Sequence, residues 1–130
     1  MTLAEIRDWL KTLKAAENYY IGRLENKKEY SIGVYEGEAA GRPVIAIGGR
    51  QNSSYDVRAV SLLLHWNRSK NESEIAAREL WNKLIEVNNE DAGENHIQYL
   101  QMTVPEPVGV GTDESGVYEY VINFKLYYRR

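Results

Sequence analysis

Two histidines are the side chains best suited to chemistry in this sequence, because imidazole can transfer protons and bind metal ions. His65 lies inside an apolar run beside Trp66, and His96 begins a later strand-like segment. The two are not spaced as a metal-binding pair, and the sequence has no HExxH motif. We therefore expect no metal site, and we expect His65 to be a sheet histidine with a backbone or tyrosine partner.

Paired carboxylates occur at Glu90-Asp91 and at Asp113-Glu114, and such pairs can act as general acid and base. Both pairs lie in polar segments, where water solvates the two charges and leaves neither acid activated. The sequence has no GxSxG nucleophile motif and no phosphate-binding GxxxxGK[ST] or GxGxxG motif. We therefore expect no catalytic residue and no cofactor, and the protein is predicted not to be an enzyme.

Composition is that of an ordinary soluble globular protein. The 130 residues are 43% hydrophobic and 27% charged, which suits one domain spanning residues 1–130. The net charge of −3 gives no general attraction for nucleic acid, so a sequence-specific nucleic-acid partner is disfavoured. No stretch has the roughly 18 apolar residues of a membrane span, and the charged N-terminal segment is not typical of a signal peptide. With no cysteine there is no disulfide framework.

Two segments have helical periodicity. The first is residues 2–14, where Thr2 and Glu5 form a capping-box pattern. The second is residues 72–88, with Asn71 as the candidate N-cap. Their apolar faces predict that both helices pack on the same face of a sheet.

The remaining segments indicate strands and loops. Strands are predicted from Tyr19 onward, at 29–38, 43–47, 55–66, 96–104 and 118–128. The first two would form a hairpin about residues 26–28, and 55–66 is apolar enough to be central and covered on both faces. Segment 88–95 reads as an acidic surface loop, and 108–116 as a long loop or flexible hairpin tip. The expected fold is α+β, with two helices packed on a mostly antiparallel twisted sheet.

Several runs resemble one known family. The most specific is Pro105–Asp113 leading into Gly116–Ile122, and Tyr30–Tyr35, Ser53–Val57 and Val60–Trp66 agree with it. The chain resembles, from residue 3 to the C-terminus, the phage minor capsid protein family, which is encoded among the head–tail joining genes of tailed phages and prophages.

The resemblance implies a protein similar to tail terminators. Such α+β subunits form a hexameric ring that caps the finished tail tube and docks it to the head connector, and they are not enzymes. The implied partners are other copies of the chain, the tail tube protein, and head connector or stopper proteins. The implied location is the virion, after assembly in the bacterial host cytoplasm.

Candidate contact residues follow from the physics of a ring, in which one surface of each copy meets a different surface of the next. The outer face of the final strand, with Val117, Val121 and Tyr127, and the free edges of the early strands are the predicted subunit interface. The 108–116 segment is predicted to project toward the channel or an axial partner, through Val108, Val110, Asp113 and Glu114. An acidic channel wall would let DNA slide past without binding.

Two other readings remain open. One is a small-molecule or peptide-binding module, with an apolar pocket enclosed by the sheet and the second helix. The weaker one is an enzyme that uses the acidic loops. Ten tyrosines against one phenylalanine fit either an interaction surface or the faces of strands. Oligomeric state distinguishes the ring from the binding module.

Overall fold

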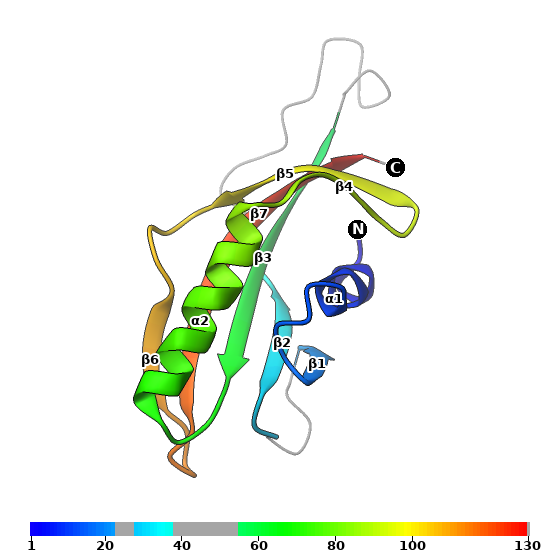
Figure 1. Cartoon of the computed structure of the whole chain (residues 1–130). Coiled ribbons are helices and arrows are strands. Elements are labelled where there is room, and N and C mark those ends of the chain that lie inside the picture. The colour runs from blue at the N-terminus through cyan, green and yellow to red at the C-terminus, as the bar shows by residue number, and fades with distance from the viewer. Residues whose placement is uncertain (23–27, 38–54, 130) are drawn as a thin grey trace.

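The computed structural model describes residues 1–22, 28–37 and 55–129, which form two helices and a mostly antiparallel sheet (Figure 1). The helices are α1 (Leu3–Lys11) and α2 (Lys70–Ile85). The strands are β1 (Asn18–Ile21), β2 (Ser31–Glu36), β3 (Asp56–His65), β4 (Asn88–Ala92), β5 (Asn95–Met102), β6 (Val108–Thr112) and β7 (Tyr118–Arg129). This arrangement confirms the predicted α+β class. The strand predicted at 43–47 lies outside the described residues.

Both helices begin at hydroxyl caps. The Thr2 hydroxyl accepts from the Glu5 amide at 3.1 Å, and the Glu5 carboxylate accepts from the Thr2 amide at 2.8 Å, which confirms the predicted capping box. Helix α2 starts earlier than predicted, because the hydroxyl of Ser69 accepts from the Glu72 amide at 3.2 Å. Asn71, the predicted cap, lies within the helix.

Strand β7 organises the sheet, whose order is β1-β2-β3-β7-β5-β4. Along one side, β7 pairs antiparallel with β3 over nearly its whole length. On its other side, β5 pairs with the C-terminal half of β7 and β6 with the N-terminal half. The predicted final strand at 118–128 is confirmed.

The predicted hairpin between the first two strands is wrong, because β1 and β2 pair in parallel, with Asn18 opposite Ser31. The amides of Glu17 and Asn18 both donate to the carbonyl of Tyr30, at 3.0 and 3.1 Å. These bonds hold the start of β1 beside the start of β2. Strands β1 and β2 are therefore not the two arms of a hairpin, and residues 26 and 27 of the predicted turn lie outside the described residues.

The acidic segment 88–95, predicted as a loop, instead contains β4, a turn and the start of β5. Its side chains bind α1. The Trp9 indole N–H donates to Glu90 at 2.6 Å, and the Asn95 amide donates to Glu5 at 2.8 Å. Because these partners lie far away in the sequence, composition alone suggested a solvated loop.

The segment 108–116 contains strand β6 and the start of the turn that joins it to β7, so the predicted long loop is wrong and the predicted hairpin is present. A bulge lies between Gly109 and Gly111 of this strand. A Cβ at position 109 would lie 3.2 Å from the ring of Tyr120. The glycine that suggested a loop therefore makes room for an aromatic ring.

The core lies between the helices and one face of the sheet. Its fully buried side chains include Ile6, Leu10, Leu80 and Leu84 from the helices and Leu62, Leu64, Ile122, Phe124 and Leu126 from β3 and β7. Strand β3 alternates between buried residues such as Leu62 and half-buried ones such as Leu63. Within the described residues, the helices cover only one face of β3, where the sequence predicted cover on both faces. Neither described helix is long and apolar enough to cross a membrane.

Candidate functional site

The face of the sheet opposite the helices, called the outer face below, carries one row of residues that crosses five strands. Successive register partners in this row are Tyr20 of β1, Gly33 of β2, Leu63 of β3, Val121 of β7 and Val108 of β6. In β2, β3 and β7 the neighbours of these residues are buried in the core, so the row points away from it, and the register places Tyr20 and Val108 on the same side. Apart from Gly33, the row is apolar or aromatic and at least partly exposed.

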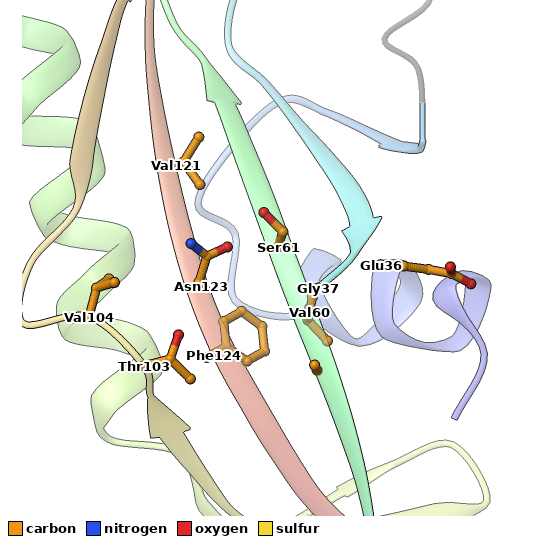
Figure 2. A pocket seen from close by; sticks show the side chains of 10 residues that line it. Glu36, Gly37, Val60, Ser61, Thr103, Val104, Val121, Asn123 and Phe124 are labelled. Carbon is orange, nitrogen blue, oxygen red and sulfur yellow. The ribbon is translucent and has the colours of Figure 1, made fainter. Parts of the chain in front are cut away.

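A groove of about 520 Å³ crosses the outer face (Figure 2). It runs from Glu36, the last residue of β2, and Gly37, over β3 and β7, to Thr103 and Val104 after β5. The hollow exists because β5 ends at Met102 and β6 begins at Val108. On the side of β7 that faces away from β3, the middle of β7 therefore has no strand partner. There the Thr103 amide donates to the Asn123 carbonyl at 3.1 Å.

Gly37 closes one end of the groove by bringing its backbone onto β3. Its amide donates to the carbonyl of Ala59 at 3.1 Å. A Cβ at this position would lie 2.7 Å from the backbone nitrogen of Val60, a contact that side chains do not tolerate. Only glycine lets the chain leave β2 along this path.

The groove is suited to contact and hydrogen bonding, not to acid–base chemistry. Ser61 and Asn123 supply uncharged polar groups, and Val121 supplies an apolar wall. Glu36 is its acid, with a side chain 77% exposed and 3.5 Å from Arg58. Among the described residues no group of three or more potential ligands could hold a metal ion.

The pocket expected between the sheet and the second helix is filled by core side chains. Leu80 and Leu84 of α2 are at most 1% exposed and belong to the same cluster as Phe124. The groove lies on the other side of the sheet. A ligand-binding reading therefore requires an open site on the outer face.

Tyr127, a predicted interface residue, belongs to an aromatic cluster on the outer face. Its ring stacks on Tyr99 with centroids 4.3 Å apart, and Tyr55 lies 5.6 Å away. The Tyr127 hydroxyl donates to Gln101 at 2.8 Å. Tyr99 is 47% exposed, so this part of the cluster is accessible to a partner. Val117, predicted for the same interface, is only 3% exposed and packs within the chain.

The four predicted channel residues separate into two kinds. Val108 and Val110 of β6 are 43% and 53% exposed, and Glu114 is exposed in the turn that follows. Asp113 is held within the chain. Its carboxylate accepts from the amides of Ser115 and Val117 at 2.8 and 3.0 Å, so it shapes the turn between β6 and β7.

His65 ties this turn to the sheet. The side chain is 1% exposed, with Nδ1 3.0 Å from Oε2 of Glu119 and Nε2 3.6 Å from Oδ2 of Asp113. Both ring nitrogens thus approach carboxylates, where the sequence predicted a backbone or tyrosine partner. Glu119 also acts on Tyr35: burial raises the pKa of the Tyr35 hydroxyl, and the negative charge of Glu119 raises it further. No spacing rule pairs His65 with acids so distant in the sequence.

The same turn is fastened to the start of α2. The Tyr118 amide donates to the Asn67 carbonyl at 2.8 Å, and the Arg68 guanidinium donates to the Ser115 carbonyl at 2.9 Å. The buried Asn67 side chain in turn accepts from the Ser69 amide at 2.9 Å. The β6–β7 hairpin is therefore a fixed feature of the fold.

The chain matches the bacteriophage tail terminator proteins over residues 4–130. The chain belongs to this tail terminator family. The relationship predicted from the sequence runs is thus confirmed. No curated protein gives a significant match.

Membership of the tail terminator family places the chain among the structural proteins of phage tails, and so among virion components that interact with other virion proteins. This agrees with a site built from exposed apolar faces and edges. The groove, the aromatic cluster and the valines of β6 are features suited to contact with other proteins.

Proposed function

We propose that this tail terminator caps the finished tail tube as a homo-oligomeric, hexameric ring and joins the tube to the head connector or stopper proteins. The observation that carries the proposal is the outer face, where apolar and aromatic side chains remain at least partly exposed over several strands. A ring of this kind acts by surface complementarity and needs no reactive group. Assembly takes place in the bacterial host cytoplasm, and the chain acts without enzymatic activity or cofactor.

Val121 and Tyr127 form part of the proposed subunit interface. A closed ring requires two different surfaces on each copy, because every copy contacts one neighbour on each side. Tyr127 sits in the exposed aromatic cluster and Val121 in the wall of the groove, and both side chains are half-buried in the single chain. A neighbour seated on the outer face would bury them. Val117 has no such surface left to bury.

Glu114 is the residue we assign to the channel wall or axial contact. It lies in the turn at the tip of the β6–β7 hairpin and is exposed. Its negative charge repels phosphate and so would deny DNA a binding site during passage. Asp113 contributes through the shape of the turn, because its carboxylate is engaged by backbone amides.

A second candidate function rests on the groove. Its volume of about 520 Å³ falls within the usual range of ligand pockets, and Ser61 and Asn123 could orient a small ligand or peptide. In the proposed ring, the same groove would instead receive part of a neighbouring copy. A chain that stays monomeric and retains a ligand in this groove would favour the binding module.

Deletion of the gene from the phage or prophage that encodes it tests the capping role. Without a cap the end of the tube stays open to further subunits, so electron micrographs should show headless tails of excessive length. The wild-type gene supplied in trans should restore tails of uniform length attached to heads. Normal virions produced by the deletion strain would refute the proposal.

A further inference from the structure

We propose that β6 of one copy pairs with β1, the terminal strand of the described sheet, of the next copy in the antiparallel sense, so that the sheet continues around the ring. This inference rests on the proposed ring and adds a second contact between neighbouring copies, at the sheet edges, to the contact proposed for the outer face. The occupant of each edge is a second copy of the same chain.

Strand β6 has the character of an edge that receives a partner. Within the described part of the chain it pairs with β7 alone, so the other side of its backbone is open. It contains no charged residue, and both of its valines are exposed. Soluble proteins protect free edges with charge, with short strands or with bulges; β6 is short and has the bulge between Gly109 and Gly111, but it has no charge, and its exposed valines favour pairing.

Strand β4, on the same side of the sheet, is protected in the usual way. It carries Glu90 and Asp91, and these acids are engaged by Trp9 at 2.6 Å and by His96 at 2.9 Å. The contrast between the two strands identifies β6 as the docking edge on this side. On the opposite side β1, which is also uncharged, is the terminal strand of the described sheet.

Strand directions make the two edges compatible. Strand β6 runs antiparallel to β7, β7 antiparallel to β3, and β3 antiparallel to β2, while β1 runs parallel to β2. Strands β6 and β1 of one copy therefore run in opposite directions. Rotation about an axis parallel to the strands preserves direction, so β6 meets β1 of the neighbour in the antiparallel sense.

The register follows from the row on the outer face. That row ends with Tyr20 at the β1 edge and Val108 at the β6 edge. A ring rotation involves no translation along its axis, so strands that run along the axis bring Val108 opposite Tyr20 of the next copy. Both side chains lie on the outer face, where an aromatic and a β-branched residue form a favourable cross-strand pair. The lengths also match, with five residues in β6 and four in β1.

Cysteine cross-linking tests this interface, since the chain has no cysteine of its own. The double variant Tyr20→Cys/Val108→Cys is expressed in the deletion strain, treated with a short bis-maleimide and analysed by denaturing gel electrophoresis. We expect a ladder of cross-linked copies up to the full ring. The matched control is Tyr20→Cys/Asp91→Cys, which moves one thiol to the β4 edge and should give no ladder.

Counting capped tails in electron micrographs of the same cells distinguishes failure of the β6–β1 interface from failure of the proposed function. If the double variant caps tails but gives no ladder, or if the control pair cross-links equally well, the β6–β1 interface is wrong and the ring stands. If the wild-type chain does not restore capped tails, the proposed function fails and this inference fails with it.

A second variant avoids dependence on the double substitution. Val110→Lys places a charge on the β6 edge and should reduce capped tails about tenfold, with the melting temperature of the purified chain unchanged. Ile75→Lys, at an equally exposed position of α2, should have no effect on capping. Full capping by Val110→Lys would overturn the inference.

Discussion

Replacement of His65 by leucine tests whether a buried histidine fixes the β6–β7 turn. The chain offers a matched pair, because His65 and His96 each place Nδ1 about 3 Å from a carboxylate, at 3.0 and 2.9 Å. They differ in burial. His65 is 1% exposed and its partner Glu119 is 21% exposed, whereas the corresponding values for His96 and Asp91 are 28% and 84%.

Burial determines the expected cost of each substitution. Leucine at position 65 fills a similar volume but leaves the partly buried Glu119 carboxylate without its donor, and a hydrogen bond to a charged group contributes about 1.5–3 kcal/mol. We therefore expect His65→Leu to lower the free energy of unfolding by about 2 kcal/mol. The same change at His96 should cost about 0.5 kcal/mol or less, because exposed pairs contribute little.

Urea unfolding of the two variants measures these values, and hydrogen exchange locates the effect. The amides of Ser115 and Val117 donate to Asp113. In His65→Leu their exchange rates, relative to the same amides in the wild type, should rise more than those of amides in the middle of β3. Equal losses of stability in the two variants would refute the argument from burial. Unchanged exchange at Ser115 and Val117 would refute the role of His65 in holding the turn.

Three further changes test other parts of the structure. Gly37→Ala places a Cβ 2.7 Å from the Val60 nitrogen and should destabilise the chain by about 1–3 kcal/mol in thermal unfolding; a stability equal to wild type would contradict the close approach. The pKa of Glu5 is lowered from 4.5, first by the hydrogen bond from the Thr2 amide and then by the one from the Asn95 side chain. The stability that Glu5 contributes is therefore present above pH 4.5 and is lost as the pH falls through the lowered pKa. Acid titrations of wild type and Glu5→Gln should therefore converge at low pH, and parallel curves would contradict this. Glu114→Lys should leave the melting temperature unchanged but reduce DNA-filled virions, whereas full titres would argue against an acidic channel wall.

Deletion of residues 109–115 is a poorer test of the channel than Glu114→Lys. It would remove most of β6 together with Asp113, whose carboxylate organises the turn. Loss of head attachment would then follow from damage to the fold. A single change at an exposed side chain separates charge from structure.

Local pattern predicted the parts of the fold that are stabilised locally. The Thr2–Glu5 capping box and the alternation of Tyr118 to Tyr128 each involve residues close in sequence, and both are present as expected. The errors occurred where a distant partner decides the structure. Glu90 is ordered by Trp9, and Gly109 leaves room for the ring of Tyr120. Parallel pairing of β1 with β2 likewise depends on bonds to Tyr30 that no local turn signal encodes.

The candidate site shows the same division. Exposed valines in β6 and the aromatic Tyr127 were identifiable as surface residues of strands or loops. The row from Tyr20 to Val108 was not, because it exists only once five strands are in register. His65 lay among apolar residues that concealed its carboxylate partners, since Glu119 becomes its neighbour only through the β3–β7 alignment.

The size of the two edges predicts when the ring forms. Pairing of four-residue β1 with five-residue β6 adds about four backbone hydrogen bonds, each with a net contribution of about 1 kcal/mol. Association of two free molecules costs about 4–15 kcal/mol in translational and rotational freedom. One edge pair therefore does not hold free subunits together at micromolar concentration.

A tail tube that binds each subunit removes most of that cost by raising the effective concentration of neighbours. Light scattering of the purified chain should thus report a monomer, and cross-linking of Tyr20→Cys/Val108→Cys should require assembled tubes. A stable ring of the free chain at micromolar concentration would show that a larger contact than these edges, such as the aromatic cluster around Tyr127, dominates the interface. Closure of the ring would then precede its arrival at the tube.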